Sequence, residues 1–225
     1  MLFRSQFWNP GLLKLGLRGR RFVALALLGA TAAAPALHAQ GAATSQQPKQ
    51  PPTVASVLNG VYGAVEQQVV SAAEAMPEEK YGFAPTNGEF KGVRTFAEEV
   101  KHIGFANHLF FGPLMGETFD VKNIQAESNG PADLKTKAQI VQYLKDSFAL
   151  GHKALSTITT ENEVTLLDKP VLPFLNTRLA IANIATFHPM DHYGQMVEYL
   201  RMNNVIPPAS RPQPPQQAPA AQPKS

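Results

Sequence analysis

The sequence predicts an all-α protein, a four-helix bundle with disordered segments at its N- and C-terminal ends. Apolar residues recur every three or four positions in four separate stretches, which is the spacing of one helix face. The alternation typical of half-buried strands is absent. Proline and small polar residues crowd the end segments, which therefore bury too little apolar surface to fold. Four amphipathic helices with two longer links are typical of a helix bundle.

The first two predicted helices flank a link rich in Gly and Pro. The first covers about residues 53–76 and ends before Pro77. The second begins at Thr95, which forms a capping box with Glu98, and it runs to about Phe111. The predicted stripe of the first helix consists of Val54, Val57, Leu58, Val61, Val65, Val69, Ala72 and Met76. The second helix is apolar on most of its sides, so periodicity does not tell which of its faces is buried.

The last two predicted helices have similar boundaries. Thr136 and Gln139 repeat the capping-box pattern, and the apolar stripe that follows them predicts a helix to about Ile158. The last helix covers about residues 177–203 and ends before Pro207.

Residues 1–39 are typical of a secretory signal peptide, because basic residues precede an apolar run at 22–36 and small residues follow it. Cleavage after Ala36 or Ala39 would release the mature chain. A retained anchor is the alternative, because the region before the apolar run is long. The run is too short, and too rich in Ala and Gly, to span a bilayer comfortably. The predicted location is therefore the bacterial periplasm or the outside, with no stable membrane insertion after cleavage.

The predicted bundle comprises residues 54–208, between a disordered linker at 40–53 and a disordered Pro-, Gln- and Ala-rich tail at 209–225. The whole chain carries a formal charge of +3, but residues 54–208 hold 12 basic and 17 acidic residues. This negative balance argues against a nucleic-acid partner. The absence of cysteine excludes disulfides, thiolate metal sites and a cysteine nucleophile.

Histidine supplies the candidate chemistry. On the last helix, His188 and His192 lie four residues apart on the predicted core-facing stripe, where two imidazoles can bind one metal ion. The alternative is two core histidines with separate hydrogen bonds. Pro189 predicts either a kink or a helix that restarts with His188 as its cap. A metal site needs a third ligand: spacing favours His152 on the third helix, and periodicity does not place His102 on the second.

Four segments match one known pattern in chain order. They are the link Met76–Pro85, the second-helix segment Thr95–Ile103, the last-helix block His188–Gln195 and the exit Tyr199–Pro208. In this order they resemble the DinB-like (DinB/YfiT) family of metalloenzymes. The resemblance implies a four-helix bundle that holds a divalent metal ion, which can be nickel, zinc or iron, on His102, His188 and His192. It therefore favours His102 over His152 as the third ligand.

The last-helix block suggests roles for further side chains. Gln195 shares the stripe of the histidines and is the predicted hydrogen-bond partner of a ligand. Tyr193 and Tyr199 are candidates to line the pocket, and core packing is the alternative for Tyr199. Asp191 and Glu99 are expected on solvated faces.

Three functions compete at this point. The first is a metal-dependent enzyme, hydrolase-like or transferase-like, that acts on an unknown small molecule through bound water or a bound thiolate. The second is a non-catalytic periplasmic metal-binding or interaction bundle. The third is a structural bundle whose histidines only pack. Three protein ligands would leave at least one metal position open, which favours chemistry or ligand capture. The resemblance also implies that two copies can pair as a homodimer.

Overall fold

The computed structural model describes residues 51–117, 124–170 and 172–212. Its long helices confirm the predicted all-α class, and no strand is assigned within those ranges. The long helices are α1 (Val54–Ala75), α2 (Phe96–Phe111), α4 (Lys137–Leu155) and α5 (Arg178–Met202). The predicted signal peptide at 1–39 lies outside the described residues, as do most of the predicted linker and tail.

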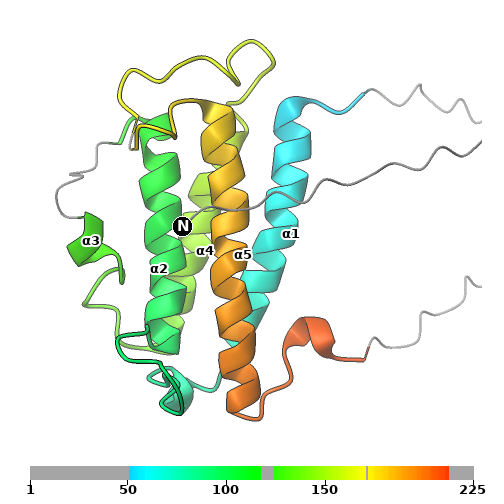
Figure 1. Ribbon diagram of the computed structural model, residues 1–225. Coiled ribbons are helices and arrows are strands. Elements are labelled where there is room, and N and C mark those ends of the chain that lie inside the picture. The colour runs from blue at the N-terminus through cyan, green and yellow to red at the C-terminus, as the bar shows by residue number, and fades with distance from the viewer. Residues whose placement is uncertain (1–50, 118–123, 171, 213–225) are drawn as a thin grey trace, which may run out of the picture. The chain divides into compact units, whose positions relative to one another are not determined.

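In the bundle, α1 lies diagonally opposite α2, and α4 lies diagonally opposite α5. α1 packs against α4 and α5, and α2 packs against the same two helices. α1 and α5 run in one direction, and α2 and α4 run in the other (Figure 1). Two helix contacts are therefore antiparallel, one between α2 and α5 and one between α1 and α4. We call these contacts the α2–α5 seam and the α1–α4 seam.

A threonine begins each of the four long helices and explains why the predicted starts agree with the observed ones. The side-chain oxygens of Thr53, Thr95, Thr136 and Thr177 each accept a hydrogen bond from the backbone N–H three residues later. Both predicted capping boxes are present, because the side chains of Glu98 and Gln139 accept from the backbone N–H of Thr95 and Thr136. Each cap stabilises its helix by about 1 kcal/mol.

Short turns that the sequence did not predict lie in the links and after α5. They are η1 (Glu78–Lys80), η2 (Gly112–Met115), α3 (Ile124–Glu127) and η3 (Pro208–Ser210). The chain after α3 packs closely on α2: Gly130 has a φ of 71°, and a Cβ atom there would lie 2.8 Å from the Lys101 carbonyl oxygen. Lys101 Nζ donates to the Pro131 carbonyl oxygen at 3.1 Å. Only glycine allows so close an approach, which brings the backbone near Ser128 alongside α2.

The hydrophobic core lies between the four long helices, with all of them contributing buried aromatic or aliphatic side chains. The predicted stripe of α1 is confirmed at its buried members Val65, Val69, Ala72 and Met76. It is wrong at Val57 and Val61, whose residues are each 51% exposed. Tyr62, which the stripe omitted, is fully buried and turns the buried face of α1 away from those two valines.

Helix α5 continues through its internal proline. Pro189 is buried inside α5, and the helix is capped at Thr177. The predicted restart with His188 as a cap is therefore wrong. Pro189 lacks the N–H that would bond to the Ala185 carbonyl, yet the flanking turns stay helical. As a result, His188 and His192 remain on one helix, one turn apart.

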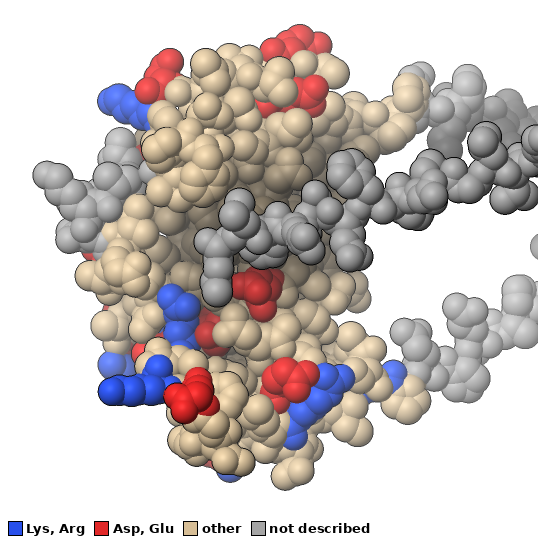
Figure 2. Space-filling model, viewed as in Figure 1, with Lys and Arg blue, Asp and Glu red and all other residues tan. Residues whose placement is uncertain are grey.

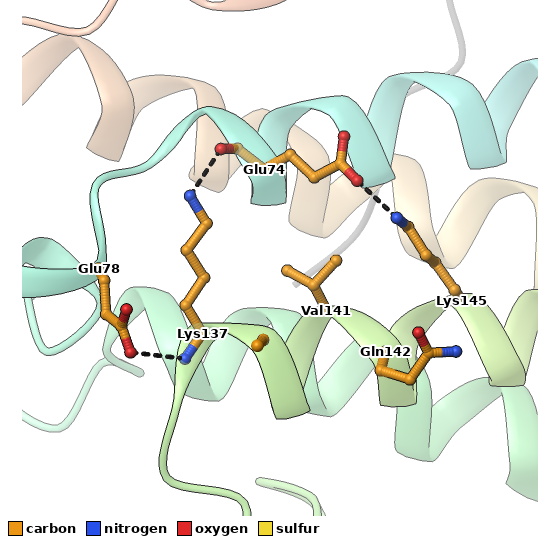
Figure 3. Close-up of a pocket in the computed structure, with 7 residues that line it drawn as sticks. Glu74, Glu78, Lys137, Val141, Gln142 and Lys145 are labelled. Atoms are coloured by element: carbon orange, nitrogen blue, oxygen red, sulfur yellow. Dashed lines mark hydrogen bonds and ion pairs between the residues drawn. The ribbon is translucent and has the colours of Figure 1, made fainter.

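Polar contacts hold the α1–α4 seam where α1 ends (Figure 3). Lys137 Nζ donates to the carbonyl oxygens of Glu74 and Met76, both at 2.8 Å, and Lys145 Nζ donates to the Glu74 carboxylate at 2.6 Å. Lys137 thus places a positive charge at the helix end whose carbonyl oxygens lack partners within the helix. The shallow pocket beside these contacts is lined by none of the histidines.

One face of the described part of the chain carries charged side chains only in places. On the face shown in Figure 2, Lys and Arg side chains lie among Asp and Glu, and most of the described surface is uncharged. Within residues 51–117, 124–170 and 172–212, no helix combines the length and the apolar character that crossing a bilayer requires.

Candidate metal centre

Three histidines meet at the α2–α5 seam. Each of His102, His188 and His192 offers a ring nitrogen, and these nitrogens all lie within 4.8 Å of one another. The three ring centroids are 4.5 to 5.2 Å apart. His102 comes from α2 and the other two from α5, so the seam brings together residues that are far apart in the sequence.

Hydrogen bonds fix two of the three rings. His102 Nδ1 is bonded to the Ser128 carbonyl oxygen. His192 Nδ1 lies 2.6 Å from Glu99 Oε2. A carbonyl or carboxylate oxygen accepts, so each Nδ1 carries the proton and donates it. In the neutral imidazole the lone pair is then on Nε2, which is the arrangement that a metal-binding histidine needs.

The third ring carries a buried nitrogen without a partner. His188 Nε2 is inaccessible to solvent and has no hydrogen-bond partner among the described residues. Such an atom costs free energy unless something pairs with it. A metal ion bound at this nitrogen would satisfy it.

Burial keeps two of the imidazoles neutral. It lowers the pKa of His102 to about 4, with the Ser128 hydrogen bond opposing and the His192, Arg94 and His188 charges adding to the shift. It also lowers the pKa of His188 to about 4, with smaller contributions from His192 and Arg94. Both rings are therefore uncharged near neutral pH, as metal ligation requires.

Glu99 is the site residue that sequence reasoning missed. It was expected on a solvated face, but it is 1% exposed and its carboxylate lies 2.6 Å from His192 Nδ1. The prediction is wrong because glutamate is seldom buried unless it is paired, and here the contact with His192 supplies that pairing. One signal was present: Glu99 and His102 are three residues apart, which places them on the same face of α2.

The other predicted site residues lie around the three histidines or in the core. Gln195 Nε2 is 3.5 Å from His192 Nδ1, a long contact to a nitrogen that Glu99 already engages. Tyr199 donates its hydroxyl to the Arg94 carbonyl oxygen at 3.1 Å and packs in the core. Tyr193 packs against the same core, and Asp191 is exposed as expected.

His152 is not part of this group. It lies on the α1–α4 seam, where Nδ1 is 2.6 Å from Asn59 Oδ1 and Nε2 is 3.0 Å from Glu66 Oε2. Both of its ring nitrogens are therefore engaged. Spacing favoured His152 because it shares a stripe with apolar residues, but α4 lies at the corner of the bundle opposite α5. That position separates His152 from the pair on α5.

The donor set suits a divalent metal ion. Three imidazoles converge, two of them hold their Nε2 lone pairs free through Nδ1 hydrogen bonds, and the third has an unpartnered buried Nε2. Imidazole nitrogen is a good ligand for zinc, nickel and iron. The arrangement of the histidines thus agrees with what the sequence resemblance implied.

Comparison with known proteins places the chain in a family. The family model described as the DinB superfamily matches residues 62–196, which is more than half of the chain. The chain belongs to the DinB superfamily. The matched segment contains all three histidines and Glu99. No curated protein matches the chain.

Proposed function

We propose that this DinB-superfamily chain binds a divalent metal ion through the Nε2 atoms of His102, His188 and His192, and that it uses the ion as a hydrolase-like or transferase-like enzyme. The observation that carries the proposal is the approach of three ring nitrogens to within 4.8 Å of one another. Nickel, zinc and iron are the candidate metals, because all three accept imidazole ligands.

The chain's own residues prepare the site. The Ser128 carbonyl orients the His102 ring, and the Glu99 carboxylate orients the His192 ring. These contacts fix the tautomers and the orientations of the two rings. A metal ion with three protein ligands keeps at least one position open, whereas structural zinc sites usually have four protein ligands. When bound, the ion would lower the pKa of water or polarise a substrate carbonyl.

Export is a separate part of the proposal. The basic, apolar and small-residue segments within residues 1–39 support secretion to the bacterial periplasm or beyond. N-terminal sequencing of the protein recovered from the periplasm or medium tests it. A start at Leu37 or Gln40 supports export with cleavage, and an intact Met1 in the cytoplasm contradicts it.

Elemental analysis of protein purified without a histidine tag tests metal binding. We expect about one equivalent of nickel, zinc or iron per chain, lost in His102→Ala and kept in His152→Ala. Circular dichroism confirms that both variants are folded. Metal-free wild-type protein that also fails to take up added zinc or nickel would contradict the proposal.

Turnover decides whether the centre is catalytic. The metal-loaded protein is offered panels of esters, amides and thiol adducts, with folded His192→Ala as the matched control. Activity that depends on His192 supports the enzyme proposal. A fully loaded protein that turns over none of these panels supports metal binding without catalysis.

A further inference from the structure

Asparagine is followed directly by glycine at three places in the chain: Asn59–Gly60, Asn87–Gly88 and Asn129–Gly130. In such a pair the backbone nitrogen of the glycine can attack the side-chain amide carbon of the asparagine, because glycine has no Cβ atom that hinders the approach. The attack requires both groups to be free, since a group held by a hydrogen bond must first be released at a cost in free energy. The surroundings of each pair therefore decide whether it reacts.

Helix α1 protects the first pair. Asn59 Nδ2 donates to the Ala55 carbonyl oxygen at 2.9 Å, and Asn59 Oδ1 lies 2.6 Å from His152 Nδ1. Gly60 lies inside the helix, where its N–H donates to the carbonyl oxygen four residues earlier. Both the amide and the nitrogen that would attack it are therefore engaged.

Hydrogen bonds protect the third pair as well. Asn129 Oδ1 accepts from Arg94 Nε at 2.9 Å, and Asn129 Nδ2 donates to Glu98 Oε1 at 3.3 Å. The N–H of Gly130 donates to the Glu127 carbonyl oxygen at 2.8 Å. An attack at this pair would have to break all three of these hydrogen bonds.

The middle pair has no such protection. Asn87 and Gly88 are both exposed in the link between η1 and α2. The backbone hydrogen bonds next to them run from Phe90 N to the Gly88 carbonyl and from Val93 N to the Phe90 carbonyl. Within the described parts of the chain, these bonds leave the Gly88 N–H free. Gly88 has a φ of 125°, which other residues rarely adopt, so the backbone itself requires a glycine after Asn87.

We propose that Asn87 is a site of spontaneous deamidation, and that the folded chain protects the other two Asn–Gly pairs from the same reaction. The Gly88 nitrogen forms a bond to Asn87 Cγ, the bond from Cγ to Nδ2 breaks, and ammonia leaves with the proton of the Gly88 N–H. One water molecule then opens the five-membered imide at either of its two carbonyl carbons, which gives aspartate or isoaspartate. The reaction needs no metal ion, so this inference is independent of the proposed function.

The modification changes the link without removing its anchors. Both products carry a negative charge where asparagine has none, and the isoaspartyl product also lengthens the backbone by one carbon atom. The link is fixed to α2 because the carbonyl oxygens of Tyr81 and Phe83 accept from the N–H groups of Ala97 and Phe96, both at 2.8 Å. These contacts lie on either side of residues 84–93, so we expect the bundle to remain folded after deamidation.

The test incubates the full-length chain at mildly alkaline pH and follows it by trypsin digestion and mass spectrometry. Trypsin cleaves after Lys and Arg, which separates the three pairs onto peptides 50–80, 81–91 and 123–135. Deamidation adds about 1 Da to a peptide, and chromatography separates the aspartyl and isoaspartyl products. The same chain unfolded in guanidinium chloride is the reference, because unfolding removes every contact described above.

We expect Asn87 to react in the folded chain within about threefold of its rate in the unfolded chain. Asn59 and Asn129 should react at least about tenfold more slowly in the folded chain, because local opening has to precede the attack. Asn87→Gln is the matched variant, since it keeps the amide but moves it too far from the Gly88 nitrogen to close a five-membered ring. The folded variant should show no gain in mass over the same period, and circular dichroism establishes that it is folded.

Three results would each overturn the proposal. In the first, folding slows Asn87 as strongly as it slows Asn59 and Asn129. In the second, one of these two protected residues reacts before Asn87 in the folded chain. In the third, folded Asn87→Gln gains mass as fast as the wild-type chain. Each of these results would leave the proposed metal binding intact, because the three histidines take no part in the reaction.

Discussion

The two antiparallel seams of the bundle each place a histidine against a glutamate, but in different surroundings. On the α2–α5 seam, the side chains of His192 and Glu99 are 7% and 2% exposed and lie 2.6 Å apart. On the α1–α4 seam, the side chains of His152 and Glu66 are 32% and 33% exposed and lie 3.0 Å apart. Water has little access to the first pair, whereas solvent screens the interaction within the second pair.

The ring nitrogens explain why one seam can hold a metal and the other cannot. His152 engages both of its nitrogens, one with Asn59 and one with Glu66, so no lone pair is left for a ligand. His192 engages only Nδ1 among the described residues, and His102 does the same. The comparison teaches that a histidine can serve as a metal ligand only if one ring nitrogen has no other hydrogen-bond partner. The number of histidines in a sequence does not reveal which of them meet this condition.

Replacing one histidine on each seam should give the largest difference. We expect His192→Ala to weaken zinc or nickel binding by more than about a hundredfold, because loss of a mere hydrogen-bonding partner of a ligand already costs ten- to hundredfold. His152→Ala should leave metal affinity unchanged and cost about 1–2 kcal/mol of stability through its two lost hydrogen bonds. Competition with a chromophoric chelator measures the affinity, and equal affinities for the two variants would contradict the assignment.

Replacing the glutamate on each seam should change metal affinity less, because the substitution by glutamine keeps the shape of the side chain. Glu99→Gln keeps an oxygen that can accept from His192 Nδ1–H but removes the buried negative charge. We expect metal affinity to fall about ten- to hundredfold. Glu66→Gln is the control, since Glu66 contacts only the histidine outside the metal group. The chelator assay with each variant decides, and a Glu99→Gln protein with wild-type affinity would show that the buried carboxylate does not tune the site.

Local signals explain how well the sequence predicted the helices. Each start depends on a threonine and on residues within one turn of it, such as Thr95 with Glu98, so the predicted starts agree with the structure to within about one residue. The predicted end of the third helix, at about Ile158, is three residues beyond the observed end of α4 at Leu155. The sequence also predicted that His188 and His192 lie side by side, because residues four apart on one helix share a face in any fold.

The choice of the third histidine depends on which helices are neighbours in the bundle, and hydrophobic periodicity does not contain that information. Both His102 and His152 lie on amphipathic helices, and the choice between them follows from α2 packing beside α5 while α4 lies at the opposite corner. Only the family resemblance supplied that information at the level of sequence. The contact of His102 with the Ser128 carbonyl could not be predicted from the sequence, because every residue has a backbone carbonyl and residue type does not show which one will make such a contact.

Two glycines, one in α4 and one in α5, offer a comparison of packing between the two seams. A Cβ atom at Gly151 of α4 would lie 2.5 Å from the Tyr62 hydroxyl oxygen and 2.7 Å from the Phe111 ring. We expect Gly151→Ala to destabilise the bundle by about 1–3 kcal/mol. At Gly194 of α5 nothing lies within 4 Å, so Gly194→Ala should stabilise by about 0.5–1 kcal/mol through helix propensity. Urea unfolding of the metal-free proteins measures both changes, and the same sign for the two variants would contradict the packing described.

The smallest predicted effect concerns the Tyr62 hydroxyl on the α1–α4 seam. Its oxygen is buried without a hydrogen-bond partner among the described residues, while the ring packs against Phe111, Phe148 and His152 with centroids 5.1 to 5.4 Å away. Tyr62→Phe removes the unsatisfied hydroxyl and keeps the ring contacts. We therefore expect stability to rise by up to about 1 kcal/mol, which raises Tm by roughly 2–4 °C.

Tyr81 supplies the matched control for this substitution. Its hydroxyl is also buried, but it donates to the Ala73 carbonyl oxygen at 2.7 Å. Tyr81→Phe should therefore lower stability by about 1 kcal/mol, because the carbonyl loses its partner. Calorimetry of both metal-free variants decides the matter through the sign of the change. A loss of stability in Tyr62→Phe equal to that in Tyr81→Phe would mean that the Tyr62 hydroxyl is satisfied, for example by an internal water molecule.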